Sequence, residues 1–325
     1  MKKILIIRFS SIGDIVLTTP VIRCLKEQLP GAAIHYLTKK ENEPILRGNP
    51  HITKTWLYEG DFSSLLPELK AEKFDYIADL HRNFRSRYVC LRLGTRSASF
   101  PKLNIRKYLA VRLHLDILPD VHIVDRYFRA VGPLGVKNDG QGLDYFIPAG
   151  DEVADGELPE THRKGFIAMV IGGKHNTKIF PADRVAELCL RLGRPVVLLG
   201  SAADRPRGEE IREAAGDLVF NACGRFSLNG SASLVRRSVA VATNDTGLMH
   251  VAAAFRKPVV SFWGNTVPAF GMYPYLPQGP APLLAEVNGL RCRPCSKLGY
   301  PECPKKHFRC MRDIDLEPVV RYLME

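Results

Sequence analysis

Glycine and acidic side chains occur together at two points of the chain where an apolar run passes into a helical pattern. One is Asn-Asp-Thr-Gly at residues 244–247, which lies between the apolar runs 238–243 and 258–263. Both runs are typical of buried parallel strands, and an alanine-rich helical segment follows the glycine. The glycine lets a ligand approach the backbone, and the free N–H groups of the first helical turn point at an anion. This turn therefore predicts a phosphate-binding site.

The other turn is Ser-Ser-Ile-Gly-Asp at residues 10–14, between a strand pattern at 3–9 and a helical pattern at 15–29. It indicates the first strand–turn–helix unit of a Rossmann-like domain, although the Gly-x-Gly-x-x-Gly fingerprint of dinucleotide-binding enzymes is missing. Asp14 is then expected in the crevice above the strand ends. For Asp14 and Asp245 the alternative interpretation is helix capping, because aspartate is favoured at helix N-termini.

The overall composition is that of a chain with two domains of ordinary size. The 325 residues are 46% hydrophobic, which supports full cores. No apolar run reaches the roughly 20 residues of a membrane span. The amino-terminal residues lead straight into a strand without a signal-peptide cleavage pattern. We therefore expect a cytoplasmic protein.

Positive charge is concentrated in one region of the chain. The formal net charge is +12, and residues 81–130 contain eleven Lys or Arg against three Asp. Such a region favours an anionic partner, which can be nucleic acid, an acidic membrane surface or a phosphorylated substrate. The excess of arginine over lysine favours two-pronged recognition of phosphate or carboxylate. A merely solvated basic face is the alternative for any single arginine.

Strand and helix patterns alternate along both halves of the chain, which indicates parallel sheets with crossover helices. Strand patterns occur at residues 34–38, 74–79, 143–147, 165–171, 195–200, 217–221, 239–243 and 258–263, and helical patterns at 182–192, 206–215 and 227–237. Residues 138–164 are acidic and rich in glycine and proline, as expected of a linker. We predict an α/β fold with two Rossmann-like domains, residues 1–150 and 151–325, facing a central cleft at the carboxyl ends of both sheets.

Four motifs resemble those of glycosyltransferase family 9, which contains the lipopolysaccharide heptosyltransferases of Gram-negative bacteria. They are Arg-Phe-Ser-Ser-Ile-Gly-Asp at residues 8–14, Asp-Leu-His-Arg-Asn-Phe-Arg-Ser at 79–86, Thr-Lys-Ile-Phe-Pro at 177–181, and residues 244–254. They follow the family's order and span nearly the whole chain. The resemblance implies an inverting, metal-independent glycosyltransferase with the two-Rossmann GT-B fold.

The resemblance also implies the substrates and the acceptor side of the site. The family's donor is typically ADP-heptose, and its acceptor is the lipopolysaccharide core or a similar lipid-linked glycan. The acid of the first turn is the family's general base, which assigns that role to Asp14 with Ser11 and Gly13 beside it. Arg85 matches the pattern Asp-Leu-x-x-x-x-Arg-Ser and is expected to pair with an acidic sugar or a lipid A phosphate. We expect peripheral contact with the cytoplasmic face of the inner membrane and no nucleic-acid partner.

On the donor side, Lys178 matches the family's phosphate-binding lysine, and an ordinary surface lysine is the alternative. The rest of the expected phosphate cradle consists of Asp245, Thr246, Gly247, Leu248 and His250. Phe226 is the candidate for an apolar contact with adenine, and packing in the core is its alternative. Asp204 lies roughly where a family acid binds the ribose hydroxyls. No cofactor is required by this set.

The eight cysteines fall into two groups. Those at positions 24, 90, 189 and 223 are scattered through the strand–helix units and are typical of small core residues in a reduced protein. The others are Cys292, Cys295, Cys303 and Cys310, which cluster with His307 among them. Their spacing permits a structural zinc site, although the second pair is wider than a paired Cys-x2-Cys. Packed thiols in a proline-rich loop are the alternative, and no catalytic metal is expected.

Two other functions fit parts of the sequence. A nucleic-acid-binding protein with a zinc-stabilised loop would show the positive charge and the cysteine cluster, but the sequence contains no recognised nucleic-acid module. A transferase or epimerase that uses another nucleotide sugar, with UDP or GDP, would share the fold, because fold alone does not separate such enzymes. A panel of donors distinguishes this second alternative.

Overall fold

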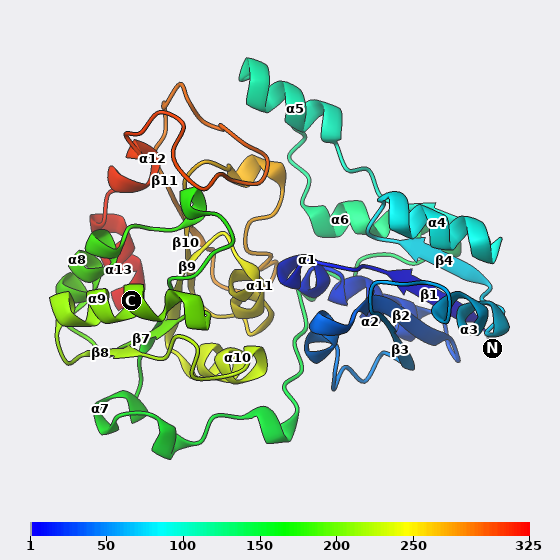
Figure 1. The fold of residues 1–325 in the computed structure, drawn as a ribbon, viewed down its shortest axis with the longest axis horizontal. Coiled ribbons are helices and arrows are strands. Elements are labelled where there is room, and N and C mark those ends of the chain that lie inside the picture. The colour runs from blue at the N-terminus through cyan, green and yellow to red at the C-terminus, as the bar shows by residue number, and fades with distance from the viewer. Residues whose placement is uncertain (1) are drawn as a thin grey trace. The chain divides into compact units, whose positions relative to one another are not determined.

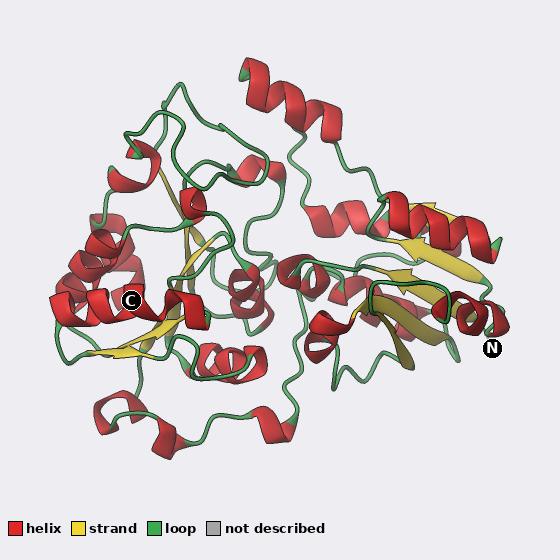
Figure 2. Cartoon of the chain, in the orientation of Figure 1, coloured by secondary structure: helices red, strands yellow, loops and turns green. Residues whose placement is uncertain are grey.

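The computed structural model describes residues 2–325, which form two compact units. The first contains the residues up to Lys102 together with Val121–Pro148, and the second contains Leu103–Asp120 together with Ala149–Glu325. Both consist of helices around a sheet (Figures 1 and 2). The division at residue 148 is close to the predicted boundary at residue 150. Residues 103–120, however, which the sequence assigned to the first domain, cluster with the second unit.

The first unit is built on a five-stranded sheet in which all neighbouring strands are parallel. The strands are β1 (Lys3–Ile7), β2 (Ala33–Lys39), β3 (Lys54–Tyr58), β4 (Tyr76–Asp79) and β5 (Ser97–Ser99). Their spatial order is β3-β2-β1-β4-β5. This is the Rossmann order, in which the chain reverses its direction of winding between β1 and β4. Sheets of this kind bind ligands at the carboxyl ends of the two strands that flank the reversal.

The second unit repeats the same order with one more strand. Its parallel strands are β6 (Ile167–Val170), β7 (Val196–Leu199), β8 (Val219–Asn221), β9 (Ala240–Asn244), β10 (Val259–Trp263) and β11 (Leu283–Glu286). Their spatial order is β11-β10-β9-β6-β7-β8. The reversal therefore lies between β6 and β9, and we expect the ligand-binding edge of this unit at the carboxyl ends of those strands.

Helices connect the strands in both units. The first unit contains α1 (Ile12–Val16), α2 (Thr19–Gln28), α3 (Leu65–Ala71), α4 (Phe84–Leu93) and α6 (Ile123–Phe128), with short 3-10 turns η1 (Lys40–Ile45) and η2 (Gly132–Leu134). The second contains α5 (Asn104–Leu113), α7 (Glu160–Arg163), α8 (Ala182–Leu192), α9 (Arg205–Ala215), α10 (Leu228–Arg237), α11 (Gly247–Ala254), α12 (Arg309–Arg312) and α13 (Glu317–Met324). Its 3-10 turns are η3 (Ala149–Asp151), η4 (Asp155–Glu157), η5 (Asn176–Lys178), η6 (Ala202–Asp204) and η7 (Pro268–Phe270). Within residues 2–325, no helix combines the length and apolar character needed to cross a membrane.

Burial on both faces of each sheet explains why most strands are nearly continuous apolar runs. In β1 the side chains of Leu5 and Ile7 are fully buried and share a core cluster with Val89 of α4. In the second unit the rings of Phe180 and Phe262 stack with centroids 4.2 Å apart. The carboxyl-terminal helix α13 packs in that same core. Helices therefore hold both sheets in place and leave the strand ends to form sites.

Most of the predicted strands and helices are confirmed, and the helix pattern at residues 182–192 matches α8 in full. The single helix predicted at residues 15–29 is wrong, because the segment forms the two helices α1 and α2. Pro20 lies in the first turn of α2, and its missing N–H cannot continue the hydrogen bonds of α1. The strand predicted at residues 143–147 is also absent. There the backbone N–H of Asp144 donates to Thr19 Oγ1 at 2.9 Å instead of to a neighbouring strand.

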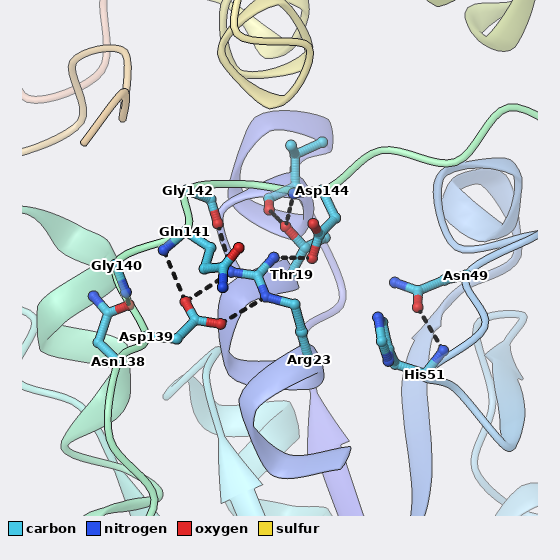
Figure 3. Close-up of polar contacts among 11 residues, drawn as sticks. Thr19, Arg23, Asn49, His51, Asn138, Asp139, Gly140, Gln141, Gly142 and Asp144 are labelled. Atoms are coloured by element: carbon cyan, nitrogen blue, oxygen red, sulfur yellow. Dashed lines mark hydrogen bonds and ion pairs between the residues drawn. The ribbon is translucent and has the colours of Figure 1, made fainter. Parts of the chain in front are cut away.

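Arg23 of α2 holds this strandless segment against the helix (Figure 3). Its guanidinium donates to both carboxylate oxygens of Asp139, at 2.8 and 2.9 Å, and to the carbonyl of Gly142 at 2.9 Å. It also pairs with Asp144. Burial alone would raise the pKa of Asp139, but the hydrogen bonds and charge of Arg23, together with hydrogen bonds from Gln141 and Cys24, outweigh it and lower that pKa to about 2. A single buried arginine thus fastens residues 139–144, in the last segment of the first unit, to α2.

We expect Arg23→Met to lower the free energy of unfolding by about 3–5 kcal/mol, because it leaves two partly buried carboxylates without their positive partner. Urea denaturation followed by circular dichroism measures the loss. Asp139 has a lower pKa in the folded state than in the unfolded state, so its contribution to stability is present above pH 4 and is lost as the pH falls toward 2. The difference between wild type and variant should shrink over that range. The exposed Arg129 gives a control, since Arg129→Met should change stability by less than about 0.5 kcal/mol.

Candidate functional site

In the first unit, Asp14 lies in the first turn of α1, just beyond the carboxyl end of β1. Its Oδ2 accepts from the hydroxyl of Ser11 at 2.6 Å and from the Ser11 backbone N–H at 3.2 Å. Its Oδ1 pairs with the guanidinium of Arg8 at 2.7 Å. The side chain is 18% exposed, so the carboxylate is held in one orientation and still reaches solvent. The structure brings Ser11, Gly13 and Asp14 together, as their positions in one turn require.

Arg8 is the buried anchor of this carboxylate. Its guanidinium donates to the carbonyls of Ser10 at 2.7 Å and Leu80 at 2.6 Å, and to the hydroxyl of Tyr127 at 3.1 Å. Burial alone would lower the pKa of Arg8, but the charge and hydrogen bond of Asp14, together with the nearby hydroxyls of Tyr127 and Tyr36, outweigh it and the pKa is raised. Arg8 therefore stays positive, and it links the loops that follow β1 and β4 with α6.

Asp79 at the end of β4 has a structural role. Its buried carboxylate accepts from the backbone N–H groups of His81 at 3.0 Å and Arg82 at 2.7 Å. It also accepts from the hydroxyl of Ser86 at 2.8 Å, and Ser86 closes the first turn of α4. This network fixes the first turn of α4, and the exposed Arg85 lies in that turn. The Arg85 guanidinium lies 6.0 Å from the ring of Tyr58.

His81 is a neutral imidazole at the same edge. Burial, followed by the charges of Arg8 and Lys102, lowers its pKa to about 3. Its ring packs edge-on against Phe9 with the centroids 5.3 Å apart. The charges of Asp14 and Arg85 contribute to this pKa as well, in opposite directions. The motif at residues 79–86 contained this histidine, but nothing in its type or spacing set it apart from its neighbours.

In the second unit, Lys178 and Asp245 meet across the reversal point of the sheet. Lys178 closes the turn η5 after β6, and Asp245 follows β9. The Lys178 ammonium lies 2.5 Å from Asp245 Oδ2, which also accepts from the hydroxyl of Thr266 at 3.1 Å. Both charged side chains are partly exposed, at 18% and 13%. Lys178 is therefore not an isolated surface lysine.

Asn244 joins the loops on which this pair stands. Its side chain is fully buried at the end of β9. The amide nitrogen donates to the carbonyls of Val170 and Gly172, and the amide oxygen accepts from the backbone N–H of Phe180 at 3.0 Å. One side chain thus holds both ends of the loop that carries Lys178.

The helix α11 begins at this edge, two residues after Asp245. Its N-cap is Thr246, not Asp245 as the capping interpretation supposed, because Asp245 is drawn to Lys178. The Thr246 hydroxyl is buried and has no hydrogen-bond partner among residues 2–325. The N–H groups of the first turn have no intrahelical acceptors. His250 is buried one turn further on. An anion placed here would find both the hydroxyl and the turn as donors.

Asp204 lies at the same edge, after β7. Its Oδ2 accepts from the hydroxyl of Ser201 at 2.6 Å and from the Ser201 N–H at 2.9 Å. A Cβ added to Gly172 would lie 2.7 Å from that oxygen, so the Lys178 loop passes directly against Asp204. Phe226 is half-buried beside the guanidinium of Arg225, 5.9 Å from its ring centroid, and so lies outside the core.

Three of the four carboxyl-terminal cysteines lie in the loop between β11 and α12, and Cys310 lies in α12. Burial raises the pKa of Cys310 to about 12 and also raises that of Cys295, and the other thiols of the cluster contribute to both shifts. The Cys292 sulfur lies 3.8 Å from His307 Nε2. Across residues 2–325, no three His, Cys, Asp or Glu side chains are arranged as ligands of a metal ion. The structural zinc stays a prediction, to be tested by metal analysis of the purified protein.

The structure adds two residues that the sequence did not single out. Asn265, just after β10, is 1% exposed, and neither atom of its amide has a hydrogen-bond partner among the described residues. Its neighbour Thr266 supports Asp245. The signal was weak, because a Gly-Asn-Thr run after a strand is typical of any loop. Both residues lie at the carboxyl end of β10 and so extend the candidate site of the second unit by one strand.

The fold is that of solved glycosyltransferases. A family 9 glycosyltransferase from Veillonella parvula superposes with a TM-score of 0.79 at 24% identity, covering 99% of this chain and 97% of the other. The Escherichia coli structure described as ADP-heptose lipopolysaccharide heptosyltransferase II gives a TM-score of 0.73 at 24% identity, with coverage of 99% and 97%. The two Rossmann-like units therefore make up a GT-B fold, as predicted.

The sequence comparisons are more specific than the fold. The model of glycosyltransferase family 9 (heptosyltransferase) matches residues 62–295. The lipooligosaccharide heptosyltransferase 2 of Haemophilus influenzae is 28% identical over 309 residues, which cover 82% of this chain and 84% of that protein. The chain belongs to glycosyltransferase family 9. It is therefore an enzyme that transfers a sugar, and the resemblance carried by its four motifs is confirmed.

We expect Asn244→Ala to lower the free energy of unfolding of the second unit by about 2–4 kcal/mol, since it leaves a buried N–H and two buried carbonyls without partners. Thermal unfolding followed by circular dichroism measures the loss. Asn176→Ala, which truncates an exposed asparagine of the same loop, is the matched control. A stability equal to that of the control would show that Asn244 does not hold the loop.

Proposed function

We propose that this enzyme transfers a heptose from ADP-heptose to the core of lipopolysaccharide or a similar lipid-linked glycan, with inversion at the anomeric carbon. The observation that carries the proposal is the fixed, solvent-reaching carboxylate of Asp14 at the reversal point of the first sheet. The name of the Haemophilus influenzae relative supports the heptose and the lipid-linked acceptor. The Escherichia coli protein of similar fold is an ADP-heptose transferase by name, which supports ADP as the carrier of the sugar.

In this mechanism Asp14 is the general base. A sugar hydroxyl is a poor nucleophile, so its proton has to leave as its oxygen attacks. Arg8 holds Asp14 Oδ1, and the exposed Ser11 hydroxyl on Oδ2 can turn aside for the acceptor hydroxyl. The acceptor oxygen bonds to the anomeric carbon, the bond from that carbon to the diphosphate breaks, and Asp14 takes the proton. A single displacement of this kind inverts the configuration.

The leaving diphosphate is stabilised by the second unit without a metal ion. Lys178 supplies the positive charge, while the Thr246 hydroxyl and the N–H groups of Gly247 and Leu248 supply oriented dipoles. Asp245 keeps the Lys178 ammonium at the edge of the sheet until the donor binds, and His250 braces the helix behind it. This arrangement provides an electrostatic cradle for negative charge that develops as the bond breaks.

The remaining residues select the two substrates. Phe226 provides a half-buried apolar face for adenine, and Asp204 provides a carboxylate for the ribose hydroxyls next to the phosphate loop. On the acceptor side, Arg85 is exposed and available to an acidic sugar or a phosphate. Ser11 and Gly13 shape the turn that receives the acceptor hydroxyl. The acceptor's lipid places the reaction at the cytoplasmic face of the inner membrane.

We expect Asp14→Asn to fold normally and bind ADP as wild type does, while kcat falls by about 10²- to 10⁴-fold, because the amide cannot accept the proton. Transfer of heptose from ADP-heptose to a purified core acceptor measures kcat, and calorimetry measures ADP binding. Asp61→Asn, at an exposed carboxylate of the same unit, is the control. Turnover by Asp14→Asn at the control rate would remove the assigned base.

We expect Lys178→Ala to weaken ADP binding by about 10- to 100-fold and to lower kcat as well. The variant loses a charge-assisted contact to phosphate in both the ground and the transition state and leaves Asp245 unpaired beside it. Titration calorimetry with ADP in the presence of EDTA measures the affinity. Lys174→Ala, at an exposed lysine of the same loop, should bind as wild type does.

The same titration with UDP, GDP and NAD tests the donor. Selective binding of ADP without metal supports the proposed reaction. Selective binding of UDP or GDP would replace ADP-heptose by another nucleotide sugar and keep the transferase. Binding of none of the four, or of NAD alone, would overturn the donor site built from Lys178 and α11.

A further inference from the structure

The helix α4 has apolar side chains on both of its faces. Its inner face packs in the core of the first unit through the buried Val89. On its outer face, Phe84, Tyr88 and Leu91 are 87%, 39% and 80% exposed. A surface helix normally turns polar residues outward. In Figure 1, α4 runs along the outside of its unit. The outer stripe therefore needs a partner that covers apolar surface.

The three exposed side chains form one line along the helix. Their spacing of four and three residues keeps them within an arc of about 60° at 3.6 residues per turn. Exposed arginines border the line on both sides, with Arg87 on one side and Arg85 and Arg92 on the other. The outer face of α4 is thus an apolar stripe between two positive edges, which we call the α4 stripe.

Charge along α4 itself has one sign. α4 contains no acidic residue, and none occurs in the sequence between Asp79 and Asp116, a stretch that contains nine Lys or Arg. Among the described residues, the three bordering arginines take part in no salt bridge. Arg92 lies with its guanidinium 6.0 Å from the ring of Tyr88. These positive groups are therefore available to an external anion.

We propose that the α4 stripe docks the enzyme on an anionic lipid bilayer, with the helix axis parallel to the surface. A bilayer interface takes apolar side chains between its headgroups, and arginines extend from their hydrocarbon stems to reach lipid phosphates. Anionic headgroups supply the negative charge that the arginine edges lack. The start of α4 carries Arg85, so docking holds the acceptor-side residues at the lipid surface.

A second copy of the chain fits the stripe less well. Pairing of two identical stripes would bring like-charged arginine edges together, and this repulsion opposes association.

The inference rests on the proposed function in one respect, because a lipid-linked acceptor is what brings the enzyme to a membrane. Binding of the enzyme to vesicles, however, needs neither donor nor acceptor.

The test is sedimentation of the full chain with vesicles. We expect the enzyme to bind vesicles of phosphatidylglycerol and phosphatidylcholine, to bind pure phosphatidylcholine at least about tenfold more weakly, and to dissociate as salt is raised. Phe84→Ser/Leu91→Ser and Arg87→Gln/Arg92→Gln should each weaken binding by about tenfold or more. Both pairs are exposed, so the variants should unfold at the wild-type temperature.

The matched control is Leu190→Ser on α8, where a leucine that is 61% exposed stands among side chains of both charges. Its vesicle binding should equal that of wild type. Wild-type binding by either α4 variant, or no vesicle binding by the wild type, would overturn the proposal. A sedimentation-velocity shift from dimer to monomer in the α4 variants would also overturn it, in favour of a second copy.

Transfer to a soluble, deacylated core acceptor separates this inference from the proposed function. Variants that lose vesicle binding but keep this transfer support both proposals. An enzyme that transfers heptose but does not bind vesicles overturns the docking alone. An enzyme that binds vesicles through the α4 stripe but transfers no heptose overturns the proposed function alone.

Discussion

In each sheet, the loops that follow the two strands flanking the reversal of strand order have to be joined. One buried polar side chain joins them in each unit. Arg8 reaches from the loop after β1 to the carbonyl of Leu80 after β4, and Asn244 reaches from the end of β9 to Val170 and Gly172 after β6. Without these side chains, the carbonyls would be buried without partners, at a cost of about 1–3 kcal/mol each. Arg8 holds Asp14 directly, and Lys178 stands on the loop that Asn244 holds at both ends, so the same constraint that closes each sheet also positions these two proposed site residues.

The two units contain the same local device in different surroundings. In both, a serine before a turn binds the aspartate three residues later, with a hydroxyl-to-carboxylate distance of 2.6 Å at Asp14 and at Asp204. The second oxygen of each faces an arginine. The partner of Asp14 is buried and that of Asp204 is 31% exposed, so only Asp14 is held against a fixed charge. The serine–aspartate turn alone therefore does not distinguish the proposed base from a helix cap, and the two turns differ in the buried arginine behind Asp14.

The elements that sequence analysis predicted well are those whose residues are buried on both sides. β6, β9 and β10 are largely apolar runs, and each is followed within three residues by a glycine whose position follows from the strand end. β3 and β5 were missed because Lys54–Tyr58 begins with two polar residues, which leaves only a short apolar run, and Ser97–Ser99 is three residues long with two serines. The ion pair between Lys178 and Asp245 could not be predicted from the sequence either. The two residues are 67 positions apart, and only the strand order brings them together. The capping interpretation of Asp245, which was the alternative to its place in the phosphate cradle, failed for the same reason.

Residues 103–120 belong to the second unit, although the chain on both sides of them belongs to the first. This arrangement links the order of folding to the order of synthesis. Lys297 donates to the carbonyl of Asn104 across a separation of 193 residues, and His114 contacts the carbonyl of Arg293 across 179. The first sheet has all its strands once residue 99 has left the ribosome. The helix α5, in contrast, must wait for the cysteine loop, which is made almost last. Ile105 and Tyr108 of this helix are still 78% and 52% exposed in the folded protein, so the segment that interrupts the first unit in sequence keeps an apolar surface after those contacts have formed.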